Sequence, residues 1–161
     1  MKIGLISDTH LYSTSKPLPD IVFSTFESCD LILHAGDILC YEVLDSLSKI
    51  SKTAAVAGNN DPDELHEWLG LKKIISVNGK RICLSHGHDG YGSAVQNIKR
   101  LSAKTEADIF VFGHSHEPIH LQENGIHFIN PGSAFQRRRQ PFCSVALLDI
   151  SEVINVRFVY F

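Results

Sequence analysis

Five short apolar runs, each followed at once by a polar cluster, organise this sequence. The runs occupy residues 2–7, 31–35, 54–57, 81–85 and 109–112. Segments with helical spacing lie between them, and β-rich runs that alternate with such segments are typical of βαβ units. The pattern therefore predicts an α/β fold.

Four amphipathic helices are expected to accompany these runs. In each helical segment, apolar residues recur at a spacing of three or four, with polar residues on the opposite face. The apolar positions are Ile21, Val22 and Phe26; Val43, Leu44 and Leu47; Leu65, Trp68 and Leu69; and Val95, Ile98 and Leu101. We expect these four helices to cover the sheet.

The third helix has clear boundary signals. Asp61 can cap the free backbone N–H groups of the first turn, and Pro62 suits the first helical position. Asp63 adds a negative charge that opposes the helix dipole, and Gly70 is expected to end the helix. The favoured interpretation of Asp61 is therefore a helix cap.

The second half of the chain carries turn signals. Asn78-Gly79 and Asn124-Gly125 lie between β-rich runs and predict type I′ hairpin turns, while residues 151–152 join the two last apolar runs. This half should therefore be richer in antiparallel strands. With 161 residues and no linker-like segment, the chain is expected to form one domain, residues 1–161.

Composition excludes several classes of protein. The net charge of -3 gives no basic field for nonspecific binding of nucleic acid or an anionic membrane. The only basic run, residues 137–139, is interpreted as a solvated loop rather than a substrate contact. The four scattered cysteines predict reduced thiols. Without a leader-like h-region or a bilayer-length apolar stretch, the expected location is cytoplasmic.

The polar clusters are expected to meet. In open α/β sheets, ligands bind beyond the carboxyl ends of the strands, so clusters at five such ends should converge on one place. The clusters are Asp8-Thr9-His10, Gly36-Asp37, Gly58-Asn59-Asn60-Asp61, Ser85-His86-Gly87-His88 and Gly113-His114-Ser115-His116.

The residue types in these clusters indicate a metal site. Asp, His and Asn without cysteine are ligands that suit Mn²⁺, Fe²⁺, Ni²⁺, Co²⁺ or Zn²⁺, whereas Ca²⁺ and Mg²⁺ prefer oxygen alone. Within residues 8–10 and 114–116, the two outer residues stand two apart, so an extended backbone would point both toward one face. Glycines before Asp37, Asn59 and His114 would allow sharp turns and close approach.

The ordered motifs Asp-x-His, Gly-Asp, Gly-Asn-x-Asp, Ser-His-Gly-His and Gly-His-Ser-His resemble the calcineurin-like metallophosphoesterase superfamily. The short chain and residues 129–133 (Ile-Asn-Pro-Gly-Ser) are similar to its small bacterial and archaeal phosphodiesterase branch, which is related to the retromer scaffold subunit. The resemblance implies a two-sheet αββα sandwich, with mixed sheets flanked by helices.

The resemblance also implies a dinuclear metal centre. One divalent transition metal ion would be held by Asp8, His10, Asp37 and His116. The other would be held by Asp37, Asn59, His86 and His114, with Asp37 as the bridge. Mn²⁺ is the first expectation, with Ni²⁺, Fe²⁺, Co²⁺ and Zn²⁺ as alternatives. A hydroxide between the two cations would attack phosphorus, because metal lowers the pKa of bound water to near neutrality.

Three further residues are implied in catalysis or substrate binding. Asn59 and His88 would neutralise charge on the phosphoryl group, and Asn60 would also contact the substrate. Many phosphomonoesterases of the superfamily have histidine where this chain has Asn60. Its absence fits the phosphodiesterase branch and leaves His88 as the candidate that helps to protonate the leaving oxygen.

Several polar residues have simpler interpretations. His34 lies inside an apolar run and is expected to be a hydrogen-bonded core residue or a support for a ligand, while His66, His120 and His127 are expected at the surface. For Asp61 the family offers an alternative to the cap, an acid that orients a neighbouring ligand.

The favoured function is a metal-dependent phosphodiesterase that acts on a small phosphate ester. A phosphomonoesterase or nuclease using the same site, and a protein-binding scaffold of the retromer-subunit type, stay open as alternatives. The acidic net charge argues against nucleic acid as the substrate. The last apolar residues, Val156 and 158–161, are expected near an edge strand and predict pairing of two copies into a homodimer.

Overall fold

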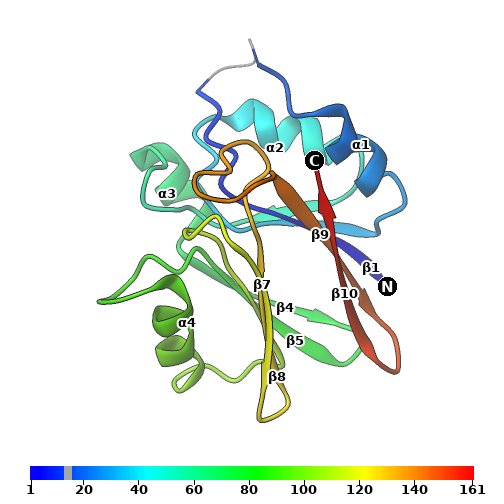
Figure 1. Cartoon of the computed structure of the whole chain (residues 1–161). Helices are drawn as coiled ribbons and strands as arrows, with labels where there is room; N and C mark the ends of the chain where they lie inside the picture. Colours follow the sequence, from blue (N-terminus) through cyan, green and yellow to red (C-terminus); the bar gives the residue numbers. More distant parts are fainter. Residues whose placement is uncertain (13–15) are drawn as a thin grey trace.

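The computed structural model describes residues 1–12 and 16–161 (Figure 1). Its helices are α1 (Asp20–Phe26), α2 (Tyr41–Ser48), α3 (Asp63–Leu69) and α4 (Ala94–Ser102). Its strands are β1 (Lys2–Ile6), β2 (Leu31–His34), β3 (Thr53–Ala55), β4 (Lys72–Val77), β5 (Lys80–Ser85), β6 (Ile109–Val111), β7 (Pro118–Glu123), β8 (Ile126–Pro131), β9 (Ser144–Ile150) and β10 (Ile154–Tyr160). All four predicted helices and all five predicted apolar strands are present.

The strands form two mixed sheets. The first has the order β10-β9-β1-β2-β3 and the second the order β4-β5-β6-β8-β7. In the first sheet β1, β2 and β3 run parallel, and in the second β5, β6 and β8 do. The remaining pairs are antiparallel, and they include both predicted Asn-Gly hairpins.

Three apolar layers hold the fold together. The central layer joins the facing sides of the two sheets and contains Ile3 and Leu5 from β1 with Ile82 and Val111 from the second sheet. The outer layers pack α1, α2 and α3 against the first sheet and α4 against the second. Figure 1 shows α1 and α2 beyond the first sheet and α4 beyond the second. The two-sheet αββα sandwich is therefore confirmed.

Strand β1 shows how the sequence produces these layers. Successive side chains of a strand point to opposite faces, and accordingly Ile3 and Leu5 lie between the sheets while Ile6 packs under the helices. Gly4 also faces the helices. A Cβ atom at Gly4 would lie 2.7 Å from the ring of Phe26, so the missing side chain lets α1 pack directly on the strand.

Local signals are mostly confirmed. Asn78 and Gly79 have φ angles of 47° and 76°, and Asn124 and Gly125 have 51° and 80°, as type I′ turns require. Gly70 ends α3 with a φ of 67°. The four cysteines are free. One surface assignment is wrong, because His127 is buried and its Nδ1 lies 3.0 Å from Nε2 of His120.

The helix-cap interpretation of Asp61 is also wrong. Helix α3 begins at Asp63, with Pro62 at the N-cap position and without a side-chain cap. Pro62 uses its carbonyl group to accept from Leu65 and His66. Asp61 lies one residue further back, and its carboxylate is committed to backbone groups at the edge of the sheet.

The last strand, β10, lies at the edge of the first sheet. Its apolar residues are divided between the layers, since Val156 and Phe158 pack against the central layer and Val159 against the helix-side layer. Tyr160 is 54% exposed. Among the described residues, the helices are all too short or too polar to cross a membrane.

Candidate metal centre

Six of the seven predicted ligands, the aspartates and histidines, follow strand ends at one edge of the sandwich, and the seventh, Asn59, follows β3. Asp8 and His10 follow β1, and Asp37 follows β2, so these three belong to the first sheet. His86 follows β5, while His114 and His116 follow β6, so these belong to the second. The site thus draws side chains from both sheets.

Asp8, His10 and His116 form one group of possible ligands. Oδ1 of Asp8 lies 3.2 Å from Nε2 of His116 and 3.8 Å from Nε2 of His10. The two imidazole Nε2 atoms are 3.2 Å apart. All three residues are buried.

Asp8, Asp37 and His86 form a second group, which shares Asp8 with the first. Nε2 of His86 lies 3.3 Å from Oδ2 of Asp37 and 4.0 Å from Oδ1 of Asp8. Oδ2 of Asp37 also lies 3.4 Å from Nε2 of His10. Each carboxylate therefore faces histidines of both groups, so anionic and imidazole donors converge from several directions.

The orientation of the imidazoles fits a metal. Nδ1 of His86 donates to the carbonyl of Ala35 over 2.7 Å, and Nδ1 of His116 donates to the carbonyl of Gln136. A carbonyl group can only accept, so Nδ1 carries the proton in the neutral ring. Nε2 is then unprotonated, and its lone pair is directed at the carboxylates. Ring nitrogens fixed in this way are typical of metal-binding histidines.

Unpaired atoms support the same conclusion. Oδ1 of Asp8 and Nε2 of His86 are buried and have no hydrogen-bond partner among the described residues. Buried polar atoms are normally paired, because leaving them bare costs free energy. Nitrogen and oxygen donors without sulfur suit borderline divalent cations. These residues therefore fit a divalent metal.

The carboxylates and imidazoles of the cluster shift one another's pKa values. Burial alone would raise the pKa of Asp8, but the adjacent imidazoles of His10, His116 and His86 outweigh it and hold that pKa well below its usual range. The pKa of Asp37 is lowered likewise, since His86 and Asn60 outweigh burial. Burial pulls the pKa of His86 down, but Asp37 and Asp8 raise it above its ordinary value. Both carboxylates are therefore ionised at neutral pH.

The backbone at these residues is left-handed. Asp8, His10, Asp37, His114 and His116 have φ angles of 52°, 48°, 57°, 69° and 59°. Such values are rare outside glycine and concentrate at functional sites. The expectation that an extended backbone aims paired ligands at one face is therefore wrong. Asp8 and His10 do face the same cluster, but left-handed turns after β1 direct them there.

Glycines make room for the carboxylates. Gly36 has a φ of 95° and turns the chain before Asp37. A Cβ atom at Gly58 would lie 2.3 Å from Oδ1 of Asp37, and one at Gly113 would lie 2.6 Å from Oδ2 of Asp8. Of the three predicted glycines, one therefore serves as a turn and two allow close approach.

We expect Gly58→Ala to lower the metal occupancy of the protein. The added methyl group would overlap both Oδ1 and the backbone nitrogen of Asp37, so the carboxylate must shift. Elemental analysis after dialysis against Mn²⁺ would measure the loss. Gly79→Ala is the control, because its Cβ would meet nothing within 4 Å and adds only left-handed strain of about 1–2 kcal/mol in a distant turn. Equal Mn²⁺ contents in both variants would contradict the prediction.

Asp61 braces the loop that carries Asp37. Its Oδ2 accepts from the backbone nitrogens of Asp37 at 2.9 Å and Gly58 at 2.7 Å. Its Oδ1 accepts from those of Ile38 and Leu39, both at 2.7 Å. One buried carboxylate thereby satisfies four N–H groups and ties the end of β2 to the end of β3. The family alternative, an acid that positions a neighbouring ligand, describes this geometry.

Three supporting residues were not singled out in the sequence for this role. Oγ of Ser7 donates to Oδ2 of Asp8 over 2.7 Å, and Oγ of Ser133 donates to the carbonyl of Asp8 over 2.7 Å. Nδ2 of Asn130 donates to the carbonyl of Gly113 over 2.7 Å. Asn130 and Ser133 belong to the segment 129–133, whose resemblance to the family was the only available signal.

The remaining predicted residues lie around the cluster. Asn60 donates to Oδ2 of Asp37 from its side chain and to Oδ1 from its backbone. Asn59 is exposed, and its side chain forms no hydrogen bond within the described part of the chain. His114 is half-buried, with its ring 5.3 Å from that of His86. The structure therefore brings Asn60, rather than Asn59, against Asp37.

His88 lies beside the cluster. Its ring is 5.4 Å from that of His86 and 6.3 Å from that of His114. Nε2 of His88 is 3.4 Å from Oδ1 of Asp89, while Nδ1 has no hydrogen-bond partner among the described residues. Burial lowers the pKa of His88 despite the opposing charge of Asp89. His34 is buried, as expected, and lies 3.2 Å from Oγ1 of Thr9.

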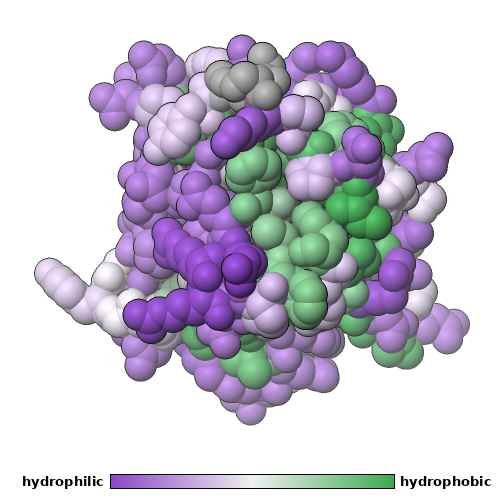
Figure 2. Space-filling view, turned by 45° about the horizontal axis from the view of Figure 1, so that its top comes forward, coloured by the Kyte–Doolittle hydropathy of each residue, from purple (hydrophilic) through white to green (hydrophobic). Residues whose placement is uncertain are grey.

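The basic run lies at the rim of the cluster. Arg137, Arg138 and Arg139 are exposed, as the solvated-loop interpretation requires. Arg138 donates to the carbonyl of His114 over 3.4 Å, which attaches the loop to the end of β6. Figure 2, in which the upper end of Figure 1 is turned forward, shows hydrophilic side chains gathered beside an apolar strip.

Known proteins share this sequence and fold. A probable metallophosphoesterase of Methanocaldococcus jannaschii is 35% identical, over 99% of this chain and 81% of the relative. The fold matches Vps29 of Entamoeba histolytica complexed with zinc (TM-score 0.80, 22% identity, 99% of both chains). It also matches an archaeal phosphodiesterase (TM-score 0.80, 23% identity, 100% of both chains). The model of the calcineurin-like phosphoesterase superfamily domain matches residues 1–153, and the chain belongs to that family.

Proposed function

We propose that this protein is a metal-dependent phosphodiesterase that hydrolyses a small phosphate diester at two divalent transition metal ions, with Mn²⁺ as the first candidate. The ligands in this proposal are Asp8, His10, Asp37, Asn59, His86, His114 and His116. The family supports a phosphoesterase that uses divalent metal. The observation that carries the proposal is the pair of ionised carboxylates, Asp8 and Asp37, enclosed by imidazoles whose Nε2 atoms face them.

The residues around the cluster would have separate roles in binding the substrate and in catalysis. When bound, divalent cations supply activated water at neutral pH and polarise the phosphoryl oxygens. Asn59 and Asn60 would orient the phosphoryl group, and Asn60 also holds Asp37 in place. When its ring is protonated, His88 would donate a hydrogen bond from Nδ1 to the leaving oxygen, and this atom has no partner among the described residues. Asp89 would fix the ring of His88 through Nε2.

We expect turnover to depend on added metal. Chelator should remove activity toward bis(p-nitrophenyl) phosphate, and Mn²⁺ or Ni²⁺ should restore it. Elemental analysis of the restored protein should find up to two transition metal ions per chain. If the refilled protein does not turn over the diester, the proposal is wrong.

The same assay separates the alternatives. Faster hydrolysis of p-nitrophenyl phosphate than of the diester would indicate a phosphomonoesterase, and hydrolysis of single-stranded DNA would indicate a nuclease. A scaffold of the retromer-subunit type would be metal-free in purified form and would bind a protein partner tightly. The presence of His10, His86, His114 and His116 in this chain favours the enzyme, because a scaffold does not need four clustered imidazoles.

A further inference from the structure

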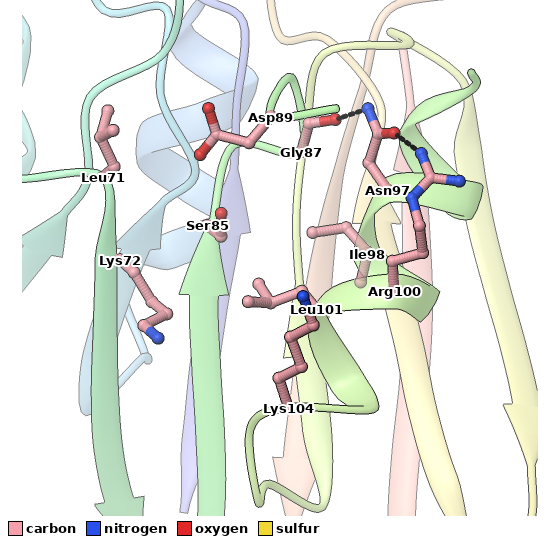
Figure 3. Close-up of a pocket in the computed structure, with 10 residues that line it drawn as sticks. All are labelled: Leu71, Lys72, Ser85, Gly87, Asp89, Asn97, Ile98, Arg100, Leu101 and Lys104. Atoms are coloured by element: carbon pink, nitrogen blue, oxygen red, sulfur yellow. Dashed lines mark hydrogen bonds between the residues drawn. The ribbon is translucent and has the colours of Figure 1, made fainter. Parts of the chain in front are cut away.

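A cavity lies beside the metal cluster, on the outer side of the second sheet. It has a volume of about 360 Å³ and opens between α4 and the ends of β4 and β5. Figure 3 shows its walls, with Leu71, Lys72 and Ser85 on the strand side and Ile98, Leu101 and Lys104 on the helix side. The volume is within the range of small-molecule sites, about 300–1,000 Å³. Of the residues that line it, the proposed reaction uses Asp89 alone, as the partner of His88.

The charged groups in the cavity favour an anion. Lys72, Arg100 and Lys104 line it, against one carboxylate, that of Asp89. Within residues 1–12 and 16–161, neither lysine forms an ion pair, and both are exposed. Arg100 is held in place by the side chain of Asn97. This concentration of positive charge contrasts with the net charge of -3 of the chain.

The rest of the lining suits an organic ligand. Ile98 and Leu101 form an apolar wall on the helix side, Leu71 lies on the strand side, and Figure 3 shows Leu101 between the two. Ser85 is 6% exposed, and its hydroxyl group makes no hydrogen bond with any described residue. An apolar wall with a few convergent polar groups is the usual composition of a small-molecule site.

One chain segment separates the cavity from the metal cluster. Ser85, Gly87 and Asp89 line the cavity, while His86 and His88, which alternate with them, face the cluster. Nδ2 of Asn97 donates to the carbonyl of Gly87 over 2.9 Å, which fixes the shared segment to α4. The two sites are therefore adjacent but distinct.

We propose that this cavity binds a small organic phosphate, with the phosphate between Lys72 and Lys104 and the organic part against the apolar wall. The hydroxyl group of Ser85 donates a further hydrogen bond to the ligand. Lysine acts as a point charge that suits phosphate. Binding does not require metal, so this inference stands apart from the proposed hydrolysis.

The test uses metal-free protein that has been dialysed free of chelator, so that the cluster cannot bind phosphate through a cation. Calorimetric titration with phenyl phosphate at low ionic strength should show saturable binding, and inorganic phosphate should bind more weakly because it lacks the ring. Lys72→Gln and Lys104→Gln should each weaken phenyl phosphate binding about tenfold, the loss expected for one charge-assisted hydrogen bond.

Controls locate the site. Arg138→Gln alters a cationic group at the other rim of the cluster and should leave phenyl phosphate binding unchanged. Metal-restored Lys72→Gln and Lys104→Gln should keep diester turnover within about twofold of the parent, since both residues lie outside the cluster. Absence of saturable binding, or binding that both lysine variants retain, would overturn the proposal. The proposal would also be overturned if Arg138→Gln lost phenyl phosphate binding while both lysine variants kept it.

Discussion

Replacing Asp37 by asparagine is expected to abolish metal-dependent hydrolysis while the fold survives. The amide has the shape of the carboxylate but not its charge, and Asp37 is the group whose Oδ2 lies between His10 and His86. Losing several kcal/mol of stabilisation at the reacting phosphoryl group corresponds to a decrease in kcat of about 10³-fold or more. Steady-state turnover of bis(p-nitrophenyl) phosphate with saturating Mn²⁺ measures it.

Two readouts make this result interpretable. Urea unfolding of the metal-free Asp37→Asn variant should still show one cooperative transition because the amide fills the same volume, at a lower midpoint because Asn60 loses its charged acceptor. Asp45→Asn is the matched control, since it removes an acid from α2 that is 68% exposed and, among the described residues, pairs only with Lys49. That variant should keep full activity. An Asp37→Asn protein with near-normal kcat would remove Asp37 from the proposed metal site.

Replacing Asp61 by asparagine should cause the largest loss of stability. The carboxylate accepts four backbone N–H groups, and an amide can offer only one oxygen while directing its own N–H groups at the others. Bonds to a charged group are worth about 1.5–3 kcal/mol each, so we expect the free energy of unfolding to fall by about 3 kcal/mol or more. Urea unfolding of metal-free protein measures it.

Asp63→Asn provides the comparison for Asp61. Asp63 is exposed in the first turn of α3 and should contribute only its favourable interaction with the helix dipole, about 0.3–1 kcal/mol. The Asp61 variant should also bind Mn²⁺ more weakly, because the loop that carries Asp37 loses its brace. Similar unfolding midpoints for the two variants would show that the four hydrogen bonds contribute little.

The local structure was largely predictable from the sequence. Apolar spacing identified four helices, and Asn-Gly pairs identified two hairpins, because both depend on residues close together in the chain. The division into two sheets was not derivable from these patterns and came from the resemblance to a family. It depends on long-range pairing, such as β9 with β1, which joins residues more than 140 positions apart.

The site was predictable in composition but not in geometry. Polar clusters after buried strands indicated which aspartates and histidines to examine, and the structure brings six of them to one edge of the sandwich. Their role as ligands stays a prediction. Asp61 was misassigned because residues 61–64 contain several acids that could cap the helix. Only the fold shows which backbone groups Asp61 meets. His127 was misassigned because its partner, His120, lies on another strand.

The left-handed turns around the cluster restrict which amino acids these positions can accept. Aspartate and histidine are among the few residues besides glycine that adopt such a backbone with some ease. The same two residue types are suitable metal donors. A replacement residue at these positions must therefore both adopt the left-handed backbone and provide a metal donor. A bulky or β-branched residue would fail the first requirement whatever its side chain could bind.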